Sequence, residues 1–282
     1  MGRRVAITGA AGQLGRQLVR AFGEAGDEVL AMARPEWDIE RPADLARLLD
    51  WRPDVVVNSA AWTDVDGCAR DPERAMQING EAAGAVARAA ALAGALSVQI
   101  STNEVFDGSL NRPYAEDAAT NPINPYGASK LRGEELVLSV NPRSLVVRTA
   151  WLFGPGGTNF VTKILAAVAR AREAGQPLRV VDDEWGNPTW TPFLADDVRD
   201  LVTRAVAPGI YHLAGEPAAT RFGWARAFLG DEAEIEAISM TEFQRASRVP
   251  PRAVLSTAKA HGIGLPERGW AEPSMELARQ HA

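Results

Sequence analysis

The chain has 282 residues, a length that suits one large α/β domain or a domain with a smaller lobe. Its net charge of −6 provides no basic field, so we expect no nucleic acid partner. One cysteine and three scattered histidines argue against a disulfide framework and against a metal site. The start of the chain lacks a signal-peptide pattern, and no apolar run approaches the roughly 20 residues that span a bilayer. We therefore expect a cytoplasmic protein with no membrane partner and no bound metal.

Three regularly spaced glycines follow the first predicted strand, residues 4–8. Gly9, Gly12 and Gly15 precede a helical pattern that runs to Ala25. Between a strand and a helix, such glycines provide a tight turn, a close approach to a pyrophosphate, and close helix–strand packing. The amino terminus of the helix then attracts the anion. An ordinary glycine-rich turn is the alternative interpretation. The predicted cofactor residues in this segment are Gly9, Gly12, Gln13, Leu14 and Gly15.

The second predicted strand, residues 28–33, ends at Arg34. An acidic residue at this place binds the ribose 2′-hydroxyl of NAD, whereas an arginine can bind a 2′-phosphate. The sequence thus favours NADPH, with NADH as the alternative if Arg34 is simply solvated. Asp38 could cap the next segment or approach the adenine, and we assign it and Ile39 to the cofactor site.

A third apolar strand, residues 54–58, lacks alternation, as a buried parallel strand does. The small residues that follow allow a cofactor to approach the backbone. A long alanine-rich helix is predicted over residues 72–93, where its small side chains suit packing against the sheet or another subunit. The sequence leaves open whether the chain is a monomer or a homodimer. The predicted cofactor residues after this strand are Ser59, Ala60, Ala61 and Thr63.

Hydroxyl residues follow the fourth predicted strand, residues 96–100. Ligands of parallel sheets bind beyond the carboxyl ends of the strands. Thr102 would there donate a hydrogen bond to a substrate oxygen, although a threonine at a strand end is commonly structural. A loop is predicted over residues 109–124, and a fifth strand over residues 144–148.

Tyr126 and Lys130 lie four residues apart at the start of the next predicted helix. Asn124 suits the N-cap position and Pro125 the first helical position. Side chains four residues apart on a helix are neighbours. Because a nearby cation favours the phenolate, the pair could exchange a proton with a substrate oxygen. The spacing also arises by chance in many helices, so its meaning depends on the other motifs.

Together these motifs resemble the extended short-chain dehydrogenase/reductase family. Further segments are similar, within that family, to the dTDP-4-dehydrorhamnose reductases. The similarity spans residues 5 to about 255. The segments that carry it are Asn58–Asp66, Ser101–Gly108, Pro125–Lys130, Arg148–Gly154, Asn159–Phe160 and Asp183–Thr189.

The resemblance implies reduction of the C4 ketone of dTDP-4-dehydro-L-rhamnose by NADPH, giving dTDP-L-rhamnose. It further implies that Tyr126 gives the proton, Lys130 lowers the pKa of Tyr126 and holds the nicotinamide ribose, and Thr102 donates to the same oxygen. Trp151 matches a tryptophan that contacts the sugar in this family; a tryptophan wedged between two lobes is the alternative. The residues implied to bind substrate are Thr102, Asn103, Glu104, Trp151, Asn159, Phe160, Trp185, Thr189, Arg248 and Arg252.

The chain departs from the family pattern at two places. The family has Asp-Tyr where this chain has Asn103 and Glu104, so a carboxylate replaces an aromatic ring beside the catalytic threonine. Glu104 could indicate another 4-ketosugar, or it could bond a neighbouring basic group. Near the carboxyl terminus Val249 stands where the family has an arginine, and either Arg248 or Arg252 could contact the diphosphate instead.

The predicted fold is α/β: a Rossmann-type doubly wound parallel sheet with a smaller C-terminal α/β substrate-binding lobe. Residues 1–150 would form the NADP-binding domain and residues 151–282 mainly the lobe, with about 190–215 returning to the sheet. A helix over residues 194–207 would carry Asp196 and Asp197 in its first turn, where carboxylates favour the helix dipole.

Two other functions compete with rhamnose synthesis. Glu104 motivates the first, reduction of another dTDP-4-keto-6-deoxyhexose. The second is a non-catalytic regulatory subunit that binds NADP, because one such subunit resembles the same subfamily. The complete set of Thr102, Tyr126 and Lys130 argues against it.

Overall fold

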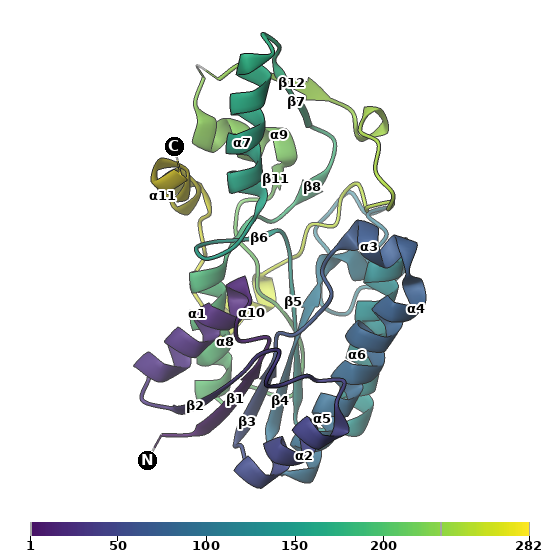
Figure 1. Cartoon of the computed structure of the whole chain (residues 1–282), viewed down its shortest axis with the longest axis vertical. Coiled ribbons are helices and arrows are strands. Elements are labelled where there is room, and N and C mark those ends of the chain that lie inside the picture. Colours follow the sequence, from purple (N-terminus) through teal and green to yellow (C-terminus); the bar gives the residue numbers. More distant parts are fainter. Residues whose placement is uncertain (1, 232, 282) are drawn as a thin grey trace.

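A computed structural model describes residues 2–231 and 233–281. Six parallel strands form the central sheet, in the order β2-β1-β3-β4-β5-β10 (Figure 1). The order reverses between β1 and β3, which makes the carboxyl edge of these two strands the topological switch point. The strands are β1 (Arg4–Thr8), β2 (Glu28–Met32), β3 (Val55–Asn58), β4 (Leu96–Thr102), β5 (Ser144–Thr149) and β10 (Gly209–His212).

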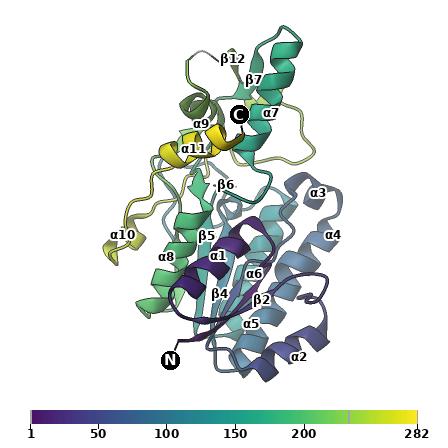
Figure 2. The same cartoon turned by 60° about the vertical axis from the view of Figure 1, so that its left-hand side comes forward.

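Helices cover both faces of the sheet (Figures 1 and 2). Alternate residues of β1 serve the two faces: Val5 and Ile7 pack toward α1 and α8, and Ala6 toward α2 and α5. Both faces are therefore covered by packed helices, and ligands of such sheets bind at the carboxyl ends of the strands. The helices are α1 (Gln13–Glu24), α8 (Thr191–Thr203) and the short α10 (Ala258–Gly262) on one side, and α2 (Pro42–Trp51), α5 (Ala83–Leu92) and α6 (Pro125–Val140) on the other.

The helix predicted over residues 72–93 is interrupted by a π-helical turn. It consists of α4 (Pro72–Ala75), a π-helical segment (Met76–Ala82) and α5, and α3 (Val65–Arg70) precedes it. Asn79, within the π-helical segment, exchanges two hydrogen bonds with the backbone of Trp62 and donates a third to Ser129 of α6. The irregular turn thus ties the segment after β3 to the helix that carries Tyr126.

A smaller lobe stands beyond the carboxyl edge of the sheet, at the top of Figure 1. Its core is aromatic: Trp224 is fully buried, contacts Phe153 and Phe160, and donates its indole N–H to Ser274. Short paired strands join it to the sheet. The lobe contains α7 (Phe160–Glu173), β7 (Leu178–Val181), α9 (Arg221–Leu229), β12 (Ile235–Ile238) and α11 (Ala271–His281), and the joining strands are β6 (Leu152–Phe153), β8 (Trp185–Gly186), β9 (Thr189–Trp190) and β11 (Ala219–Thr220).

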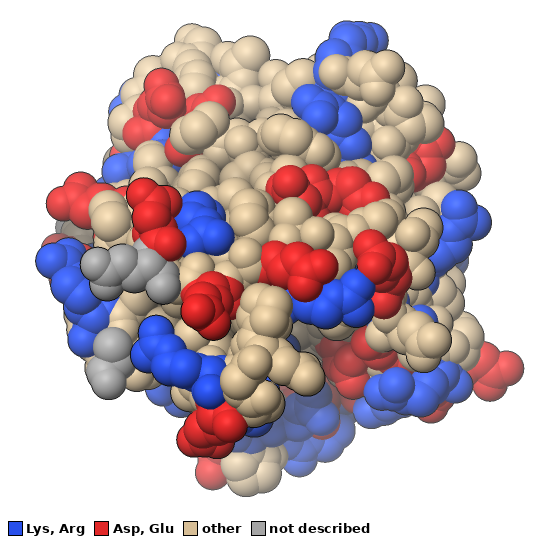
Figure 3. Space-filling view, turned by 90° about the horizontal axis from the view of Figure 1, so that it is seen from above, with Lys and Arg blue, Asp and Glu red and all other residues tan. Residues whose placement is uncertain are grey.

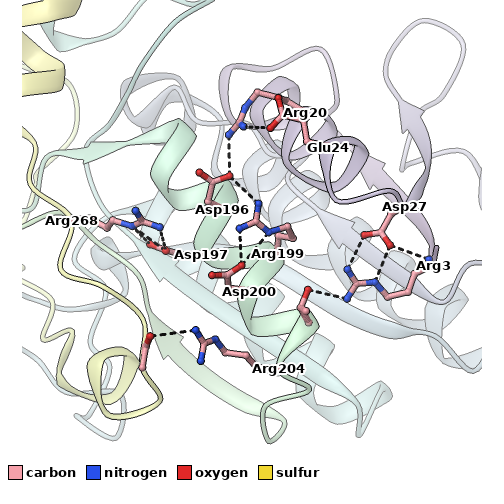
Figure 4. A network of polar contacts seen from close by, with 12 residues as sticks. Arg3, Arg20, Glu24, Asp27, Asp196, Asp197, Arg199, Asp200, Arg204 and Arg268 are labelled. Atoms are coloured by element: carbon pink, nitrogen blue, oxygen red, sulfur yellow. Dashed lines mark hydrogen bonds and ion pairs between the residues drawn. The ribbon is translucent and has the colours of Figure 1, made fainter. Parts of the chain in front are cut away.

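The prediction for Asp196 and Asp197 was wrong. Helix α8 begins at Thr191, three residues earlier than expected, because Pro192 fits the first turn of a helix. Both aspartates therefore lie beyond that turn and pair with arginines instead (Figure 4). Asp197 accepts from Arg268 at 2.6 Å, and Asp196 from Arg20 at 3.1 Å.

The surface carries charges of both signs. The face seen from above the lobe has acidic and basic side chains interspersed (Figure 3). Among the described residues, no helix is both long enough and apolar enough to cross a membrane.

Candidate active site

The glycine turn after β1 lies against the segment after β3, at the switch point. Gly9 has a φ of +67°, and a Cβ there would stand 2.8 Å from the backbone nitrogen of Ala60. A Cβ at Gly15 would stand 2.1 Å from the carbonyl oxygen of Gly9. At Gly12, the N-cap of α1, a Cβ would stand 3.1 Å from the same oxygen, and among the described residues no side chain caps the helix. The amino terminus of α1 is thus open to an anion, in the geometry that a pyrophosphate requires.

A cavity of about 240 Å³ extends from this turn toward the end of β2. Arg34 is largely exposed at its rim, with Nε 3.9 Å from a carboxylate oxygen of Asp38. Trp37 and Ile78 contribute to the wall. The predicted cofactor residues that line this cavity are Gly9, Gly12, Arg34, Asp38, Ile39, Ser59, Ala60 and Ala61.

A second cavity, of about 460 Å³, continues from the first along the strand ends, because Gly9, Gly12, Ser59 and Ala61 line both. It brings together all three predicted catalytic side chains, Thr102, Tyr126 and Lys130. The remaining predicted residues that line it are Gln13, Leu14, Gly15, Thr63, Asn103, Glu104 and Trp151.

Helix α6 presents Tyr126 at its first turn. Asn124 accepts a hydrogen bond from the amide of Gly127, which makes it the N-cap, and Pro125 follows it. Burial raises the pKa of Tyr126, the negative charge of Glu104 raises it further, and hydrogen bonding with Thr102 opposes the rise. The pKa of Tyr126 is thus raised, whereas the resemblance implied that Lys130 lowers it. Tyr126 therefore holds its proton near neutral pH, as a proton donor must.

Lys130 lies one turn further along α6 and is 4% exposed. Its Nζ donates to the carbonyl oxygen of Ile100 at 2.6 Å. Burial lowers the pKa of Lys130 to about 8, although the nearby Glu134 raises it. Glu134 in turn binds Arg148 of β5 at 2.7 Å in a fully buried ion pair, and accepts from Ser101 of β4. This buried network joins the ends of β4 and β5 to α6, the elements that carry or precede the predicted catalytic side chains.

One buried hydroxyl in the wall of the second cavity lacks a partner. Thr149 stands beside Thr102 in the register of β4 and β5, and within the described part of the chain its Oγ1 has no hydrogen-bond partner. Buried polar groups are normally satisfied, so this atom suits a ligand. With the open end of α1 and the close approach at Gly9, this unpartnered hydroxyl is compatible with a dinucleotide and a polar substrate at this edge.

Glu104 lies two residues after Thr102 on the same turn. Its amide donates to Thr102 Oγ1 at 3.2 Å, and its Oε2 accepts from Asn124 at 2.6 Å. Burial raises the pKa of Glu104 to about 7; the charge of Glu184 adds to the rise, and Arg245 and Arg221 oppose it. Among the described residues, no cation lies within ion-pair distance of this carboxyl.

Trp151 forms the junction between the sheet and the lobe. Its φ of +44° is rare for a residue with a side chain, and its ring lies 3.5 Å from the guanidinium carbon of Arg221. A Cβ at Gly186 would stand 2.4 Å from this ring, so the glycine makes room for it. Arg221 also binds Glu184 at 3.0 Å and lines the second cavity. A strained and tightly packed aromatic residue at a cavity wall is typical of a ligand-contacting position.

The other residues implied to bind substrate lie in the lobe or at its base, outside the lining of the second cavity. Asn159 is the N-cap of α7, and Phe160 stacks on Trp224. Thr189 is buried and bonds the backbone of Asn187 and Gly215. The guanidinium of Arg252 lies over the ring of Trp185. Arg248 lines a separate cavity of about 470 Å³, together with Glu184, Arg245 and Val249.

Sequence reasoning missed Arg221, Glu184 and Arg245. Arg221 begins α9, about 70 residues after Trp151, and nothing in the local pattern indicates that the two stack. No group of three or more His, Cys, Asp or Glu side chains that could hold a metal ion is found in the described part of the chain.

Comparison with known proteins agrees with this geometry. The family model described as "RmlD substrate binding domain" matches residues 3–281. The chain belongs to this family.

A dTDP-4-dehydrorhamnose reductase of Streptomyces griseus is 39% identical over 94% of this chain and 89% of its own. A probable dTDP-4,6-dihydroxy-2-methyloxan-3-one 4-ketoreductase of Streptomyces antibioticus is 37% identical over 98% of this chain and 96% of its own. Among solved structures, dTDP-4-dehydrorhamnose reductase of Bacillus anthracis in complex with NADP is 30% identical, covers 100% of both chains and has a TM-score of 0.90. The chain is thus an oxidoreductase of the dTDP-4-dehydrorhamnose reductase type, and its predicted Rossmann-type fold is confirmed.

Proposed function

We propose that this enzyme uses NADPH to reduce the C4 ketone of dTDP-4-dehydro-L-rhamnose to dTDP-L-rhamnose. The observation that carries the proposal is that Thr102, Tyr126 and Lys130 meet in one cavity that continues into the glycine turn after β1. The relatives named above support both the cofactor and the class of sugar nucleotide.

The cofactor site is the pair of connected cavities. The open amino terminus of α1 and the glycine turn would hold the pyrophosphate, and the first cavity the adenosine half. Arg34, exposed at the rim of that cavity, would bind the 2′-phosphate. Lys130, whose Nζ lies at the end of β4, would hold the nicotinamide ribose.

The bound nicotinamide supplies a hydride to C4 of the sugar. The π electron pair of the carbonyl moves to its oxygen, which takes the phenolic proton of Tyr126 and becomes a hydroxyl. Thr102 donates to the same oxygen and stabilises the charge that develops there. The phenolate left behind lies on the same helix as Lys130 and is reprotonated from solvent, which restores the enzyme.

The lobe would bind the rest of the substrate. Trp151 and Arg221 belong to its contribution to the second cavity, and the cavity lined by Arg245 and Arg248 offers cations for the diphosphate. We propose residues 1–150 as the cofactor domain and 151–282 mainly as the substrate lobe, with about 190–215 belonging to the sheet.

A second candidate is a reductase of another dTDP-4-keto-6-deoxyhexose. Glu104 favours it, because a carboxyl group beside Thr102 replaces the aromatic residue that the family pattern has there. The two candidates share every chemical step and differ only in the sugar.

The decisive experiment follows NADPH oxidation with purified dTDP-4-dehydro-L-rhamnose. We expect turnover by the wild type and a loss of at least about 1000-fold in Tyr126→Phe, since general acid catalysis contributes about that much. NADPH binding by Tyr126→Phe should stay unchanged. Rapid turnover of Tyr126→Phe would refute the mechanism. Wild-type activity confined to another 4-ketosugar would support the second candidate, and tight NADPH binding without any turnover would support a regulatory subunit.

Cofactor choice rests on Arg34. We expect Arg34→Ala to lower the ratio of kcat/KM for NADPH to kcat/KM for NADH by about tenfold. This is the effect expected when one charge-assisted hydrogen bond to the 2′-phosphate is lost. An unchanged ratio would remove Arg34 from the cofactor site.

A further inference from the structure

Glu104 is a carboxyl group in the catalytic cavity whose hydrogen-bonding capacity is only half used. Oε2 accepts from Asn124, while within the described residues Oε1 has no hydrogen-bond partner. An ionised or neutral carboxyl can hold several partners at its two oxygens. Glu104 therefore has an oxygen available to a ligand in the cavity that it lines.

The position of Glu104 relative to Thr102 restricts which ligand atom it can reach. The Glu104 amide bonds Thr102 Oγ1 at 3.2 Å, so both side chains leave one tight turn at the end of β4. If Thr102 and Tyr126 hold the carbonyl oxygen, Glu104, two residues further along the turn, lies beside the substituents of a neighbouring carbon, whereas the Asn103 amide donates to the carbonyl oxygen of Ala253. In a 4-keto-6-deoxyhexose one neighbour of C4 carries a hydroxyl and the other a methyl group. A carboxyl suits the hydroxyl.

We propose that Glu104 binds the hydroxyl on C3, next to the reacting carbonyl, and thereby selects hydroxyketone sugars over their 3-deoxy analogues. This inference rests on the proposed ketoreductase function. It assigns to Glu104 the choice of sugar and leaves the proton transfer to Tyr126.

The surroundings of Glu104 suit this role better than a purely structural one. Both amide protons of Asn124 are used, by Glu104 and by the carbonyl oxygen of Arg248, which holds the carboxyl in a fixed position. Arg221 and Arg245 are directed to Glu184 rather than to Glu104. Burial holds the pKa of Glu104 at about 7, so the group is present in both forms near neutral pH. The carboxylate can accept from the hydroxyl and the acid can donate to it.

The test compares kcat/KM for a dTDP-4-ketohexose that carries the C3 hydroxyl with kcat/KM for its 3-deoxy analogue. A site built to bond a hydroxyl rejects the analogue strongly, so we expect a wild-type ratio of about 100 or more. Glu104→Met keeps the length of the side chain and removes its hydrogen bonds, and should lower the ratio to about 3 or less. Glu104→Gln keeps both kinds of hydrogen bond and should restore most of the ratio.

The outcomes separate the two proposals. A wild-type ratio near 1, or a ratio that Glu104→Met leaves unchanged, overturns the role of Glu104 and leaves the ketoreductase function standing. A wild type that reduces neither sugar overturns both. If Glu104→Met fails to bind NADPH or to fold, the wild-type ratio decides, together with its change with pH, which the uncharged Glu104→Gln should not share. A merely structural glutamate would reduce the rates with both sugars equally and leave the ratio as it was.

Discussion

The proposed cofactor end of the site, at the glycine turn after β1, and the proposed sugar end, near Trp151, differ in the atoms that form their surfaces. At the cofactor end the backbone forms the surface: Gly9 and Gly15 bring chain segments within distances that no side chain permits, and α1 offers an uncapped terminus. At the sugar end side chains form it, with Glu104 on the turn after β4 and Trp151 and Arg221 at the base of the lobe. A surface made of backbone atoms is determined by a short glycine pattern in the sequence. A surface made of side chains is determined by packing between segments that are far apart in the sequence.

The buried ion pair beneath the catalytic helix should be the most costly to break. Glu134→Gln leaves the Arg148 guanidinium buried without a counter-charge, because the two side chains are only 2% and 3% exposed. We expect a loss of about 3–5 kcal/mol in the free energy of unfolding, measured with urea. Glu184→Gln is the control at the sugar end, where its partner Arg221 is 23% exposed and the loss should be about 1 kcal/mol. Equal losses of unfolding free energy in Glu134→Gln and Glu184→Gln would show that the ion pair beneath α6 contributes no more to stability than the one in the lobe.

The same difference explains which parts of the structure could be predicted. Six strands of the sheet, the last of them expected over residues 209–213, and the start of α6 were predicted to within two residues, since apolar runs, the N-cap Asn124 and the following Pro125 determine them locally. The start of α8 was wrong because Pro192 was not recognised as a first-turn residue. Strand β12 and helix α11 were missed, and the stacking of Arg221 on Trp151 depends on α9 packing against the lobe. No local pattern contains that information.

A backbone clash should disable the cofactor end. In Gly15→Ala the new Cβ would meet the carbonyl oxygen of Gly9 at 2.1 Å, and the turn must move because that oxygen belongs to the backbone and the Cβ is held rigidly by its own Cα. We expect a loss of about 1–3 kcal/mol in stability and at least a tenfold weaker Kd for NADPH. Gly23→Ala on the same helix is the control, since no atom of another element lies within 4 Å of its Cβ in the described part of the chain, and it should be neutral or slightly stabilising. Equal NADPH affinities of the two variants would contradict the assigned cofactor site.

A side-chain clash should disable only the sugar end. Gly186→Ala would place a Cβ 2.4 Å from the ring of Trp151, which must then leave its stack with Arg221. We expect KM for the sugar nucleotide to rise about five- to tenfold, equivalent to about 1 kcal/mol, with the Kd of NADPH unchanged. Gly262→Ala, where nothing lies within 4 Å of the Cβ, serves as the control. A change in NADPH affinity instead of KM would show that the two ends are not independent.

The charge at Glu104 should make the sugar end sensitive to pH. The pKa of this carboxyl rises from 4.5 to about 7 on folding, because burial, with a contribution from the Glu184 charge, outweighs the hydrogen bond from Asn124 and the charges of Arg245 and Arg221. The folded state then binds the proton more tightly than the unfolded state does. The stability that this group contributes is complete below pH 4.5 and is lost as the pH rises toward 7.

Glutamine carries no charge at any pH, so the Glu104→Gln variant should match the wild type at pH 4.5 and exceed its stability at pH 8. At about 1.4 kcal/mol per pKa unit, the difference should be about 1–3 kcal/mol in urea unfolding. Glu267→Gln, at an exposed position, should show no such trend. If the stability of the wild type instead rises relative to that of Glu104→Gln as the pH rises, Glu104 has a cationic partner in solution. Its carboxyl would then be committed to that partner and no longer available to a sugar hydroxyl, so this measurement also tests the basis for sugar selection.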